Sequence, residues 1–198
     1  LLLMLLALSR LAAVARAEDD HDDDREEPPR AYTLVIDGHP HEILTDSPFT
    51  IPGTFTDPRI VLRAAATRHF ARGGMSFDYP ASFTWEAEIE GPANKTWTLS
   101  GNDSKIMVFV LPDPLSVDEY AHSMASQFGE RDTRIGDTER VLGGERRAGK
   151  RLAVVVTGVR LFFEIYTLPS AEGSRVLVFQ DCPTEGQPIS AEGKDVLV

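Results

Sequence analysis

The sequence predicts an α+β fold in which an antiparallel β-sheet is flanked by helices and preceded by an N-terminal β-hairpin. Two patterns carry this prediction: strand-like alternation recurs between residues 60 and 181, and residues 116–128 have the spacing of an amphipathic helix. Hydrophobic residues make up 42% of the chain and charged residues 26%, which is the balance of a folded globular protein. The 198 residues fit one domain with a tail.

The N-terminal segment, residues 1–17, predicts a secretory signal peptide. Its leucine-rich run ends at Ala15-Arg16-Ala17, the small-x-small pattern that precedes a signal peptidase cut. The alternative is a membrane anchor, but the uninterrupted apolar run stops at Ser9, well short of the roughly 20 residues that cross a bilayer. We expect a mature protein that begins at Glu18, is exported to the periplasm or beyond the cell, and is not inserted in a membrane. The opening at Leu1 also predicts a fragment at this end.

Residues 18–30, EDDHDDDREEPPR, predict a disordered acidic tether. They contain eight acidic residues and two arginines, but no large apolar residue that a core would bury. The whole chain has a net charge of −11. Because an acidic surface repels phosphate groups, this balance argues against nucleic acid and anionic membranes as partners.

Residues 31–59 predict a β-hairpin followed by a connector. Apolar residues alternate along Tyr32–Ile36, and Asp37-Gly38 suits a two-residue turn because both residues readily take positive φ angles. His39–Leu44 is then expected to return antiparallel. Pro40 confines this second strand to a sheet edge, since proline cannot donate a ladder hydrogen bond.

The remaining residues, 60–198, predict the main α+β domain. Its first part, residues 57–70, is ambiguous: Asp57-Pro58 resembles a helix start, but no helical stripe follows it, so an extended strand is favoured over a helix. Alternating apolar residues predict further strands at 75–79, 83–89, 96–99 and 105–111.

The clearest helix is predicted over residues 116–128. Ser116 and Glu119 form a capping box at its start, and Gly129 supplies the stop. Its apolar stripe is expected to lie across the sheet with Met124 and Phe128 buried.

The C-terminal part follows a polar stretch and predicts the centre of the sheet. Segments rich in Val, Phe and Leu predict three strands, at residues 150–157, 159–168 and 175–181. A last helix is expected to begin near Ser190. Because its apolar stripe stops soon after it starts, the sequence also predicts truncation at the C-terminus.

The segment Gly74-Met-Ser-Phe-Asp-Tyr-Pro-Ala-Ser-Phe83 resembles the start of PsbP-like domains, which carry Gly-hydrophobic-Ser-Phe-x-Tyr-Pro. The later order of a Ser-x-x-Glu helix, a three-strand meander and a terminal helix is similar as well, so the resemblance spans roughly residues 60–198. It implies an αβα sandwich. The family includes the lumenal extrinsic subunit of photosystem II and many exported bacterial proteins, and most known roles are binding and assembly. The resemblance implies no catalytic residue.

A phosphate-loop pattern is nearly present at Gly144–Lys150, but the next residue is Arg151 where a magnesium ligand requires Ser or Thr. The β-branched run that follows also predicts a strand, whereas a phosphate loop leads into a helix. A glycine-rich hairpin is the better interpretation, and no cofactor is expected.

His39 and His41 are the best candidates for a metal site, because residues two apart on a strand point to the same face. Two ligands do not complete a site, and His69, His122 or the acidic tether would have to supply the others. Exposed edge histidines are the simpler interpretation, so no metal is expected.

Nucleophilic and carboxylate chemistry have weak support. Cys182 is the only cysteine and has no histidine near it in sequence, so a structural thiol is expected. Glu86, Glu88 and Glu90 alternate along one strand, as on a solvated sheet face. The expected function is therefore a non-enzymatic exported binding or assembly module with a protein partner. The alternative is a metal-binding or hydrolytic envelope protein that uses His39 and His41.

Overall fold

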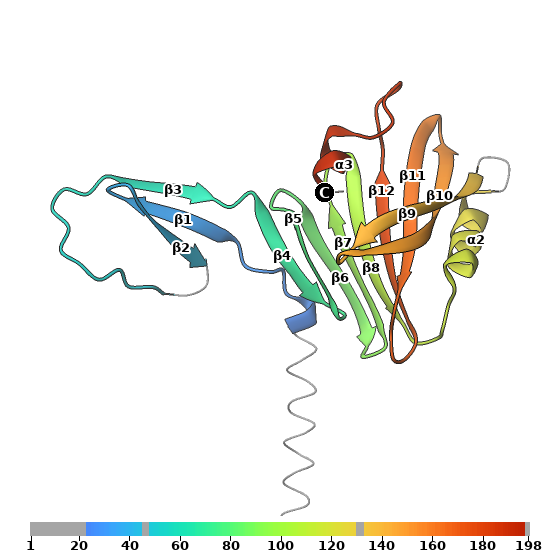
Figure 1. Ribbon diagram of the computed structural model, residues 1–198, viewed down its shortest axis with the longest axis horizontal. Coiled ribbons are helices and arrows are strands. Elements are labelled where there is room, and N and C mark those ends of the chain that lie inside the picture. Colours follow the sequence, from blue (N-terminus) through green and yellow to red (C-terminus); the bar gives the residue numbers. More distant parts are fainter. Residues whose placement is uncertain (1–22, 45–47, 130–132, 197–198) are drawn as a thin grey trace, which may run out of the picture. The chain divides into compact units, whose positions relative to one another are not determined.

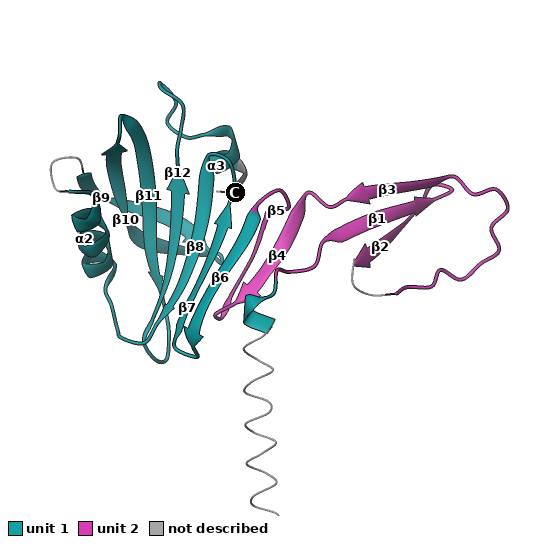
Figure 2. Ribbon diagram, turned by 180° about the vertical axis from the view of Figure 1, so that it is seen from behind, with its two compact units in different colours: residues 1–26, 84–198 teal, residues 27–83 magenta. Residues whose placement is uncertain are grey.

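The computed structural model describes residues 23–44, 48–129 and 133–196. The chain divides into two compact units: unit 1 is residues 1–26 with 84–198, and unit 2 is residues 27–83 (Figure 2). Within the described ranges no helix is long and apolar enough to cross a membrane. The signal peptide predicted for residues 1–17 lies outside the described residues.

Unit 1 is built on one seven-stranded antiparallel sheet with the order β6-β7-β8-β12-β11-β10-β9 (Figure 1). The three strands predicted for the centre of the sheet, β10, β11 and β12, lie between β8 and the edge strand β9. The bounds are β6 Thr84–Gly91, β7 Asn94–Ser100, β8 Ser104–Leu111, β9 Thr133–Leu142, β10 Glu145–Val156, β11 Val159–Leu168 and β12 Ser174–Asp181.

The predicted fold class is wrong. Strands account for 55% of the described residues and helices for 12%, so the protein is mostly β and is not an αβα sandwich. One cause is β9, which lies in the polar stretch where no strand was predicted. This strand lies at a sheet edge and is largely exposed, so its charged residues are suited to water and its alternation is weak. The other cause is α3, Ala191–Val196, which has only six residues.

Helix α2, Val117–Phe128, forms where the capping box predicts it. It packs on β9, β10 and β11, and its buried residues are Ala121 and Ala125. Met124 and Phe128 were expected to be buried, but they are only partly buried at the edge of the core. Ala121 and Ala125 face the sheet directly, because their small side chains let the helix pack close to it.

Residues 23–26 differ from the predicted tether, because they contact the sheet of unit 1. The indole N–H of Trp97 donates to the carbonyl of Asp24 at 2.7 Å, and Lys95 pairs with the Asp24 carboxylate. Arg25 donates to the carbonyl of Ile89 at 2.6 Å. The acidic segment therefore has polar partners that its composition does not reveal.

Unit 2 contains a three-stranded sheet, in the order β2-β1-β3, and the two-stranded β4–β5 hairpin. The bounds are β1 Ala31–Ile36, β2 His39–Leu44, β3 Ile60–Ala64, β4 Thr67–Arg72 and β5 Met75–Pro80. The predicted hairpin is confirmed, with φ angles of 50° at Asp37 and 87° at Gly38. The ambiguous segment is extended rather than helical, as favoured, but it forms two strands, β3 and β4, in different sheets instead of one. The predicted boundary after residue 59 would separate β3 from β1, although these two strands pair within one sheet.

Candidate functional site

The clearest candidate site is one face of the three-stranded sheet in unit 2. The strand register places three rows of side chains on this face. The rows across β2, β1 and β3 are His39–Ile36–Ile60, His41–Leu34–Leu62 and Ile43–Tyr32–Ala64. The face is therefore apolar apart from two histidines and the tyrosine hydroxyl.

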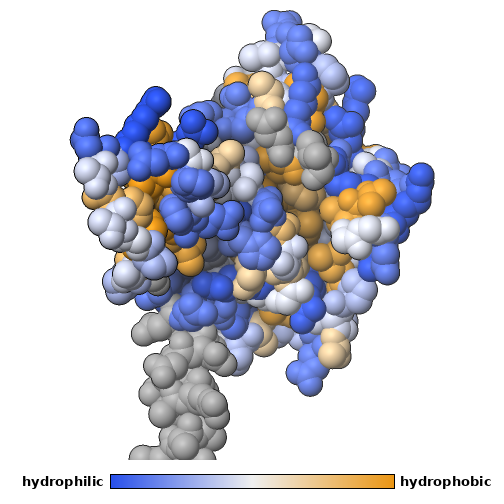
Figure 3. Space-filling view, turned by 60° about the vertical axis from the view of Figure 1, so that its left-hand side comes forward, coloured by the Kyte–Doolittle hydropathy of each residue, from blue (hydrophilic) through white to orange (hydrophobic). Residues whose placement is uncertain are grey.

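The apolar side chains of β3 are open to solvent. Ile60 is 58% exposed and Leu62 57% exposed, whereas Ile36 in the neighbouring strand is 7% exposed. The space-filling view shows apolar surface, in orange, among polar side chains (Figure 3). Isolated exposed apolar residues are common, but adjacent ones on a sheet face are typical of interaction sites.

The same strand has a free hydrogen-bonding edge among the described residues, because β3 pairs only with β1. The N–H of Ala65 donates to the carbonyl of Ala31 at 2.9 Å, and the carbonyl of Arg59 accepts from Asp37 at 3.0 Å. Since backbone groups alternate in direction along a strand, those of Ile60, Leu62 and Ala64 point away from β1. The exposed side chains and the free backbone groups thus belong to the same residues.

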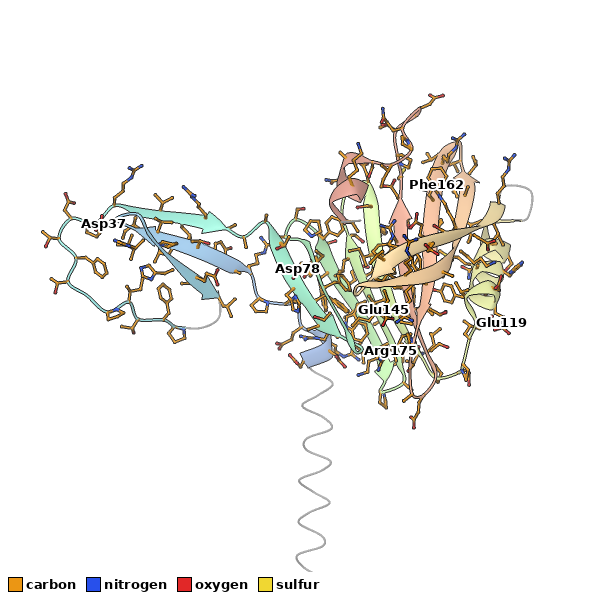
Figure 4. The ribbon with its side chains drawn as sticks, viewed as in Figure 1. Asp37, Asp78, Glu119, Glu145, Phe162 and Arg175 are labelled. Carbon is orange, nitrogen blue, oxygen red and sulfur yellow. The ribbon has the colours of Figure 1, made fainter. Side chains whose placement is uncertain are left out.

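The opposite edge of this sheet is blocked. The two-residue turn makes Ile36 and His39 the first hydrogen-bonded pair of the hairpin, so Pro40 lies with its backbone toward the outer edge of β2. Proline has no N–H, and it protects an edge against further pairing. Asp37, which is labelled in Figure 4, lies at the turn between the two strands and accepts from the N–H of Arg59 at 2.8 Å.

The second face of β3 carries positive charge. Arg59 lies just before the strand and Arg63 lies within it. Because side chains alternate along a strand, both point to the face opposite to that of Ile60 and Leu62. Both arginines are exposed. The edge of β3 therefore presents apolar groups on one side and cations on the other.

His39 and His41 lie on the same face of β2, as predicted. His39 is exposed and His41 is half-buried. The described residues contain no group of three or more His, Cys, Asp or Glu side chains placed to hold a metal ion. His69 lies in β4, so it belongs to the other sheet of the unit, and His122 lies in α2 of unit 1.

A row of hydrogen-bonded residues crosses the β4–β5 hairpin. The Nδ1 of His69 lies 2.7 Å from Asp78 Oδ1, and its Nε2 lies 3.0 Å from the Oγ of Ser76. Nucleophile, base and orienting carboxylate are connected in this way in hydrolases. The His69 and Asp78 side chains are, however, 59% and 66% exposed, so water competes for both contacts. Figure 4 labels Asp78 on this hairpin.

This row was not predicted, although the sequence contains a signal for it. Gly73 and Gly74 have φ angles of 57° and 71°, as a two-residue hairpin turn requires. Recognising that turn fixes the register, which pairs His69 with Asp78 directly across the strands. The edge of β3 had no comparable signal, since its pairing with β1 is not local.

In unit 1, the near phosphate-loop is a turn between strands, as predicted. Gly143 and Gly144 have φ angles of 59° and 81°, and the chain continues directly into β10. An open cavity of about 470 Å³ lies at the start of α2. Its polar groups already have partners, since Ser116 and Glu119 cap the helix and the Ser174 hydroxyl accepts from the N–H of Leu115 at 2.5 Å.

The other candidates are Cys182 and the glutamates of β6. Cys182 follows β12 and is half-buried, and its N–H donates to the carbonyl of Asp103 at 2.8 Å. Glu86 and Glu88 are exposed on β6, as expected for a solvated strand face. No protein-family model and no curated protein matches this sequence.

Proposed function

We propose that this protein is an exported, non-enzymatic binding module that takes up an extended segment of a partner protein at the free edge of β3. One observation carries the proposal: Ile60 and Leu62 combine exposed apolar side chains with backbone groups that point away from β1. Strand addition uses both features, because backbone hydrogen bonds supply affinity and alternate side chains supply specificity.

The two faces of β3 define the chemistry of the partner segment. Beside Ile60 and Leu62, an added strand buries apolar side chains. On the opposite face, Arg59 and Arg63 favour acidic side chains, since opposite charges across neighbouring strands attract. The partner segment therefore alternates apolar and acidic residues. Pro40 directs it to β3, because the β2 edge lacks a donor at that position.

Export is the second part of the proposal and is supported by the predicted signal peptide. N-terminal sequencing of the protein recovered from its host is expected to begin at Glu18. Recovery of the leucine-rich segment on the mature protein would instead make it membrane-anchored.

A synthetic nine-residue peptide of alternating isoleucine and glutamate tests strand addition. Hydrogen exchange measured by NMR on the full chain is expected to show new protection at the amides of Ile60, Leu62 and Ala64. A peptide with lysine in place of glutamate is expected to bind more weakly, because it faces Arg59 and Arg63. Protection confined to β2, or none at any peptide concentration, would refute the proposed edge.

Two matched variants distinguish peptide binding at the β3 edge from non-specific binding. Leu62→Glu places a charged carboxylate against the isoleucine side chains of the peptide and is expected to weaken its binding at least about tenfold. Leu44→Glu is the control, because Leu44 is 50% exposed but lies on the blocked strand β2. Equal losses in the two variants would show that the peptide has no preference for β3.

Hydrolysis is a second candidate function, favoured by the contact of Ser76 with His69 and of His69 with Asp78. A fluorophosphonate probe is expected to label Ser76 if this hydroxyl is activated, and Ser76→Ala should abolish the labelling. Ser123→Ala serves as the control for an exposed serine. Labelling that Ser76→Ala removes would make the protein an enzyme and overturn the non-enzymatic proposal.

A further inference from the structure

A second candidate site in unit 2 lies at the end of β3 and shares Ala64 with the β3 edge. A pocket of about 220 Å³ is lined by residues at the ends of β1, β3 and β5 and at the start of β4. Four alanines form its apolar part, and its polar part consists of Arg30, Thr67, Arg68 and Ser82. Pockets for drug-sized ligands begin at roughly 300 Å³, so this one suits a smaller molecule.

Arg68 is the unusual member of the lining, because its side chain is only 1% exposed. Its Nη1 donates to the carboxylate of Glu27, while Nε and Nη2 have no hydrogen-bond partner among the described residues. Tyr79 lies directly opposite Arg68 in the β4–β5 register, and its buried hydroxyl interacts with the guanidinium but makes no well-formed hydrogen bond. Throughout the described ranges, these three atoms are the buried side-chain nitrogens and oxygens that lack one.

Such a concentration of unpaired donors requires an explanation, because a buried cation that lacks hydrogen bonds is costly. Burial acts to lower the pKa of Arg68, but its interactions with Glu27 and with the hydroxyl of Tyr79 keep the pKa above its ordinary value. The guanidinium therefore keeps its charge at every physiological pH. Glu27 meets only one of its nitrogens, so the cation still needs acceptors.

We propose that this pocket binds a small organic carboxylate ion. The carboxylate oxygens accept hydrogen bonds from the Arg68 guanidinium, which matches a carboxylate in shape, and the short apolar part of the ion lies against the alanines. Arg30 and Arg68 carry two positive charges and Glu27 one negative charge, which leaves one positive charge for a monovalent anion. Ser82 and Thr67 add hydroxyl donors.

Titration of the full chain with sodium propionate and sodium acetate at constant ionic strength tests this proposal. Saturable one-to-one binding is expected, with a shift of the Arg68 Nε–H resonance in a nitrogen–proton NMR spectrum. Sodium chloride in the same range should give neither effect. If propionate and chloride cause the same linear change, water satisfies Arg68 and the proposal is wrong. Tighter binding of inorganic phosphate than of propionate would likewise overturn the carboxylate assignment.

Three variants complete the test. Arg68→Met keeps the length of the side chain without its charge, and should weaken propionate binding at least about tenfold. Arg30→Gln should weaken propionate binding several-fold. If Arg68→Met fails to fold, the Arg30 variant is the one that tests the site. Arg72→Gln is the matched control, because Arg72 lies in the same strand but does not line the pocket. Equal affinities of the Arg30 and Arg72 variants would refute the site.

Discussion

The carboxylate of Glu192 accepts two hydrogen bonds from a single residue, Ser104: one from its backbone N–H at 2.9 Å and one from its hydroxyl at 3.1 Å. The N–H groups of Asn102 and Asp103 donate to the same carboxylate at 3.1 and 2.8 Å. Four donors from the β7–β8 turn thus hold the first turn of α3. A second polar contact lies at the start of α3, where the N–H and the hydroxyl of Ser190 donate to the Asp181 carboxylate at 3.0 and 2.5 Å.

Glu192→Gln is expected to lower the free energy of unfolding by about 1.5–3 kcal/mol at pH 7, since hydrogen bonds to a charged group are lost. Denaturant melts measure the change. Glu185→Gln, at an exposed position before the helix, should have almost no effect. Equal shifts would mean that the carboxylate does not hold α3.

The contribution of Glu192 should also depend on pH. Burial acts to raise the pKa of Glu192, but hydrogen bonds from Asp103, Asn102 and Ser104 lower it below the ordinary value of 4.5. A lowered folded-state pKa gives stability that is present above the unfolded value and is lost as the pH falls through the folded value. The difference between wild type and Glu192→Gln should therefore shrink below about pH 4.5. A difference that stays constant down to pH 2 would contradict this assignment.

Phe163 should contribute more to stability than Phe128, although their rings contact each other, with centroids 5.5 Å apart and planes tilted by 31°. Phe163 is 2% exposed in the core cluster, while Phe128 is only partly buried. Phe163→Ala should cost about 3–5 kcal/mol in denaturant melts, and Phe128→Ala roughly half as much. Gln127→Ala, on the exposed face of α2, should stay within about 0.5 kcal/mol. A Phe128 variant as stable as the Gln127 variant would show that α2 does not pack on the sheet.

Gly149 in β10 should not tolerate a side chain. A Cβ atom there would lie 2.5 Å from the carbonyl oxygen of Ile165 and 2.5 Å from Cε1 of the buried Tyr166. Gly149→Ala should therefore cost about 1–3 kcal/mol in a thermal or denaturant melt. Gly136→Ala in β9 is the control, since no atom lies within 4 Å of the added carbon. Equal stabilities of the two variants would contradict the close packing of Tyr166 on β10.

Trp97→Phe should loosen the acidic segment from the sheet. Trp97 is fully buried, and the variant leaves the carbonyl of Asp24 without the indole donor at 2.7 Å. The expected cost is about 1–3 kcal/mol, and trypsin should cleave after Arg25 faster than in the wild type. Trp85→Phe loses a longer bond, 3.1 Å to the carbonyl of Arg25, and should show a smaller effect. Unchanged cleavage in the Trp97 variant would show that residues 23–26 are held by other contacts.

Local signals predicted many elements correctly. The Asp37-Gly38 turn, the capping box of Ser116 and Glu119, and the central strands all formed where the sequence placed them. Each signal acts over a few residues, so the chemistry that creates it is already present in the local sequence. The same is true of the place of His39 and His41 on one strand face.

The tertiary structure determined the features that depend on contacts between residues far apart in sequence. The exposed edge strand β9 forms because β10 supplies its ladder, and β12 pairs with β8 across an intervening helix and three strands. The open edge of β3 exists only because β1 takes its other side, and Arg68 becomes a buried cation only when β4 and β5 fold against each other. Burial and strand pairing are properties of residues far apart in sequence, so no short pattern encodes them. For that reason the helix and turns were predictable, whereas the mostly-β architecture and both proposed sites were not.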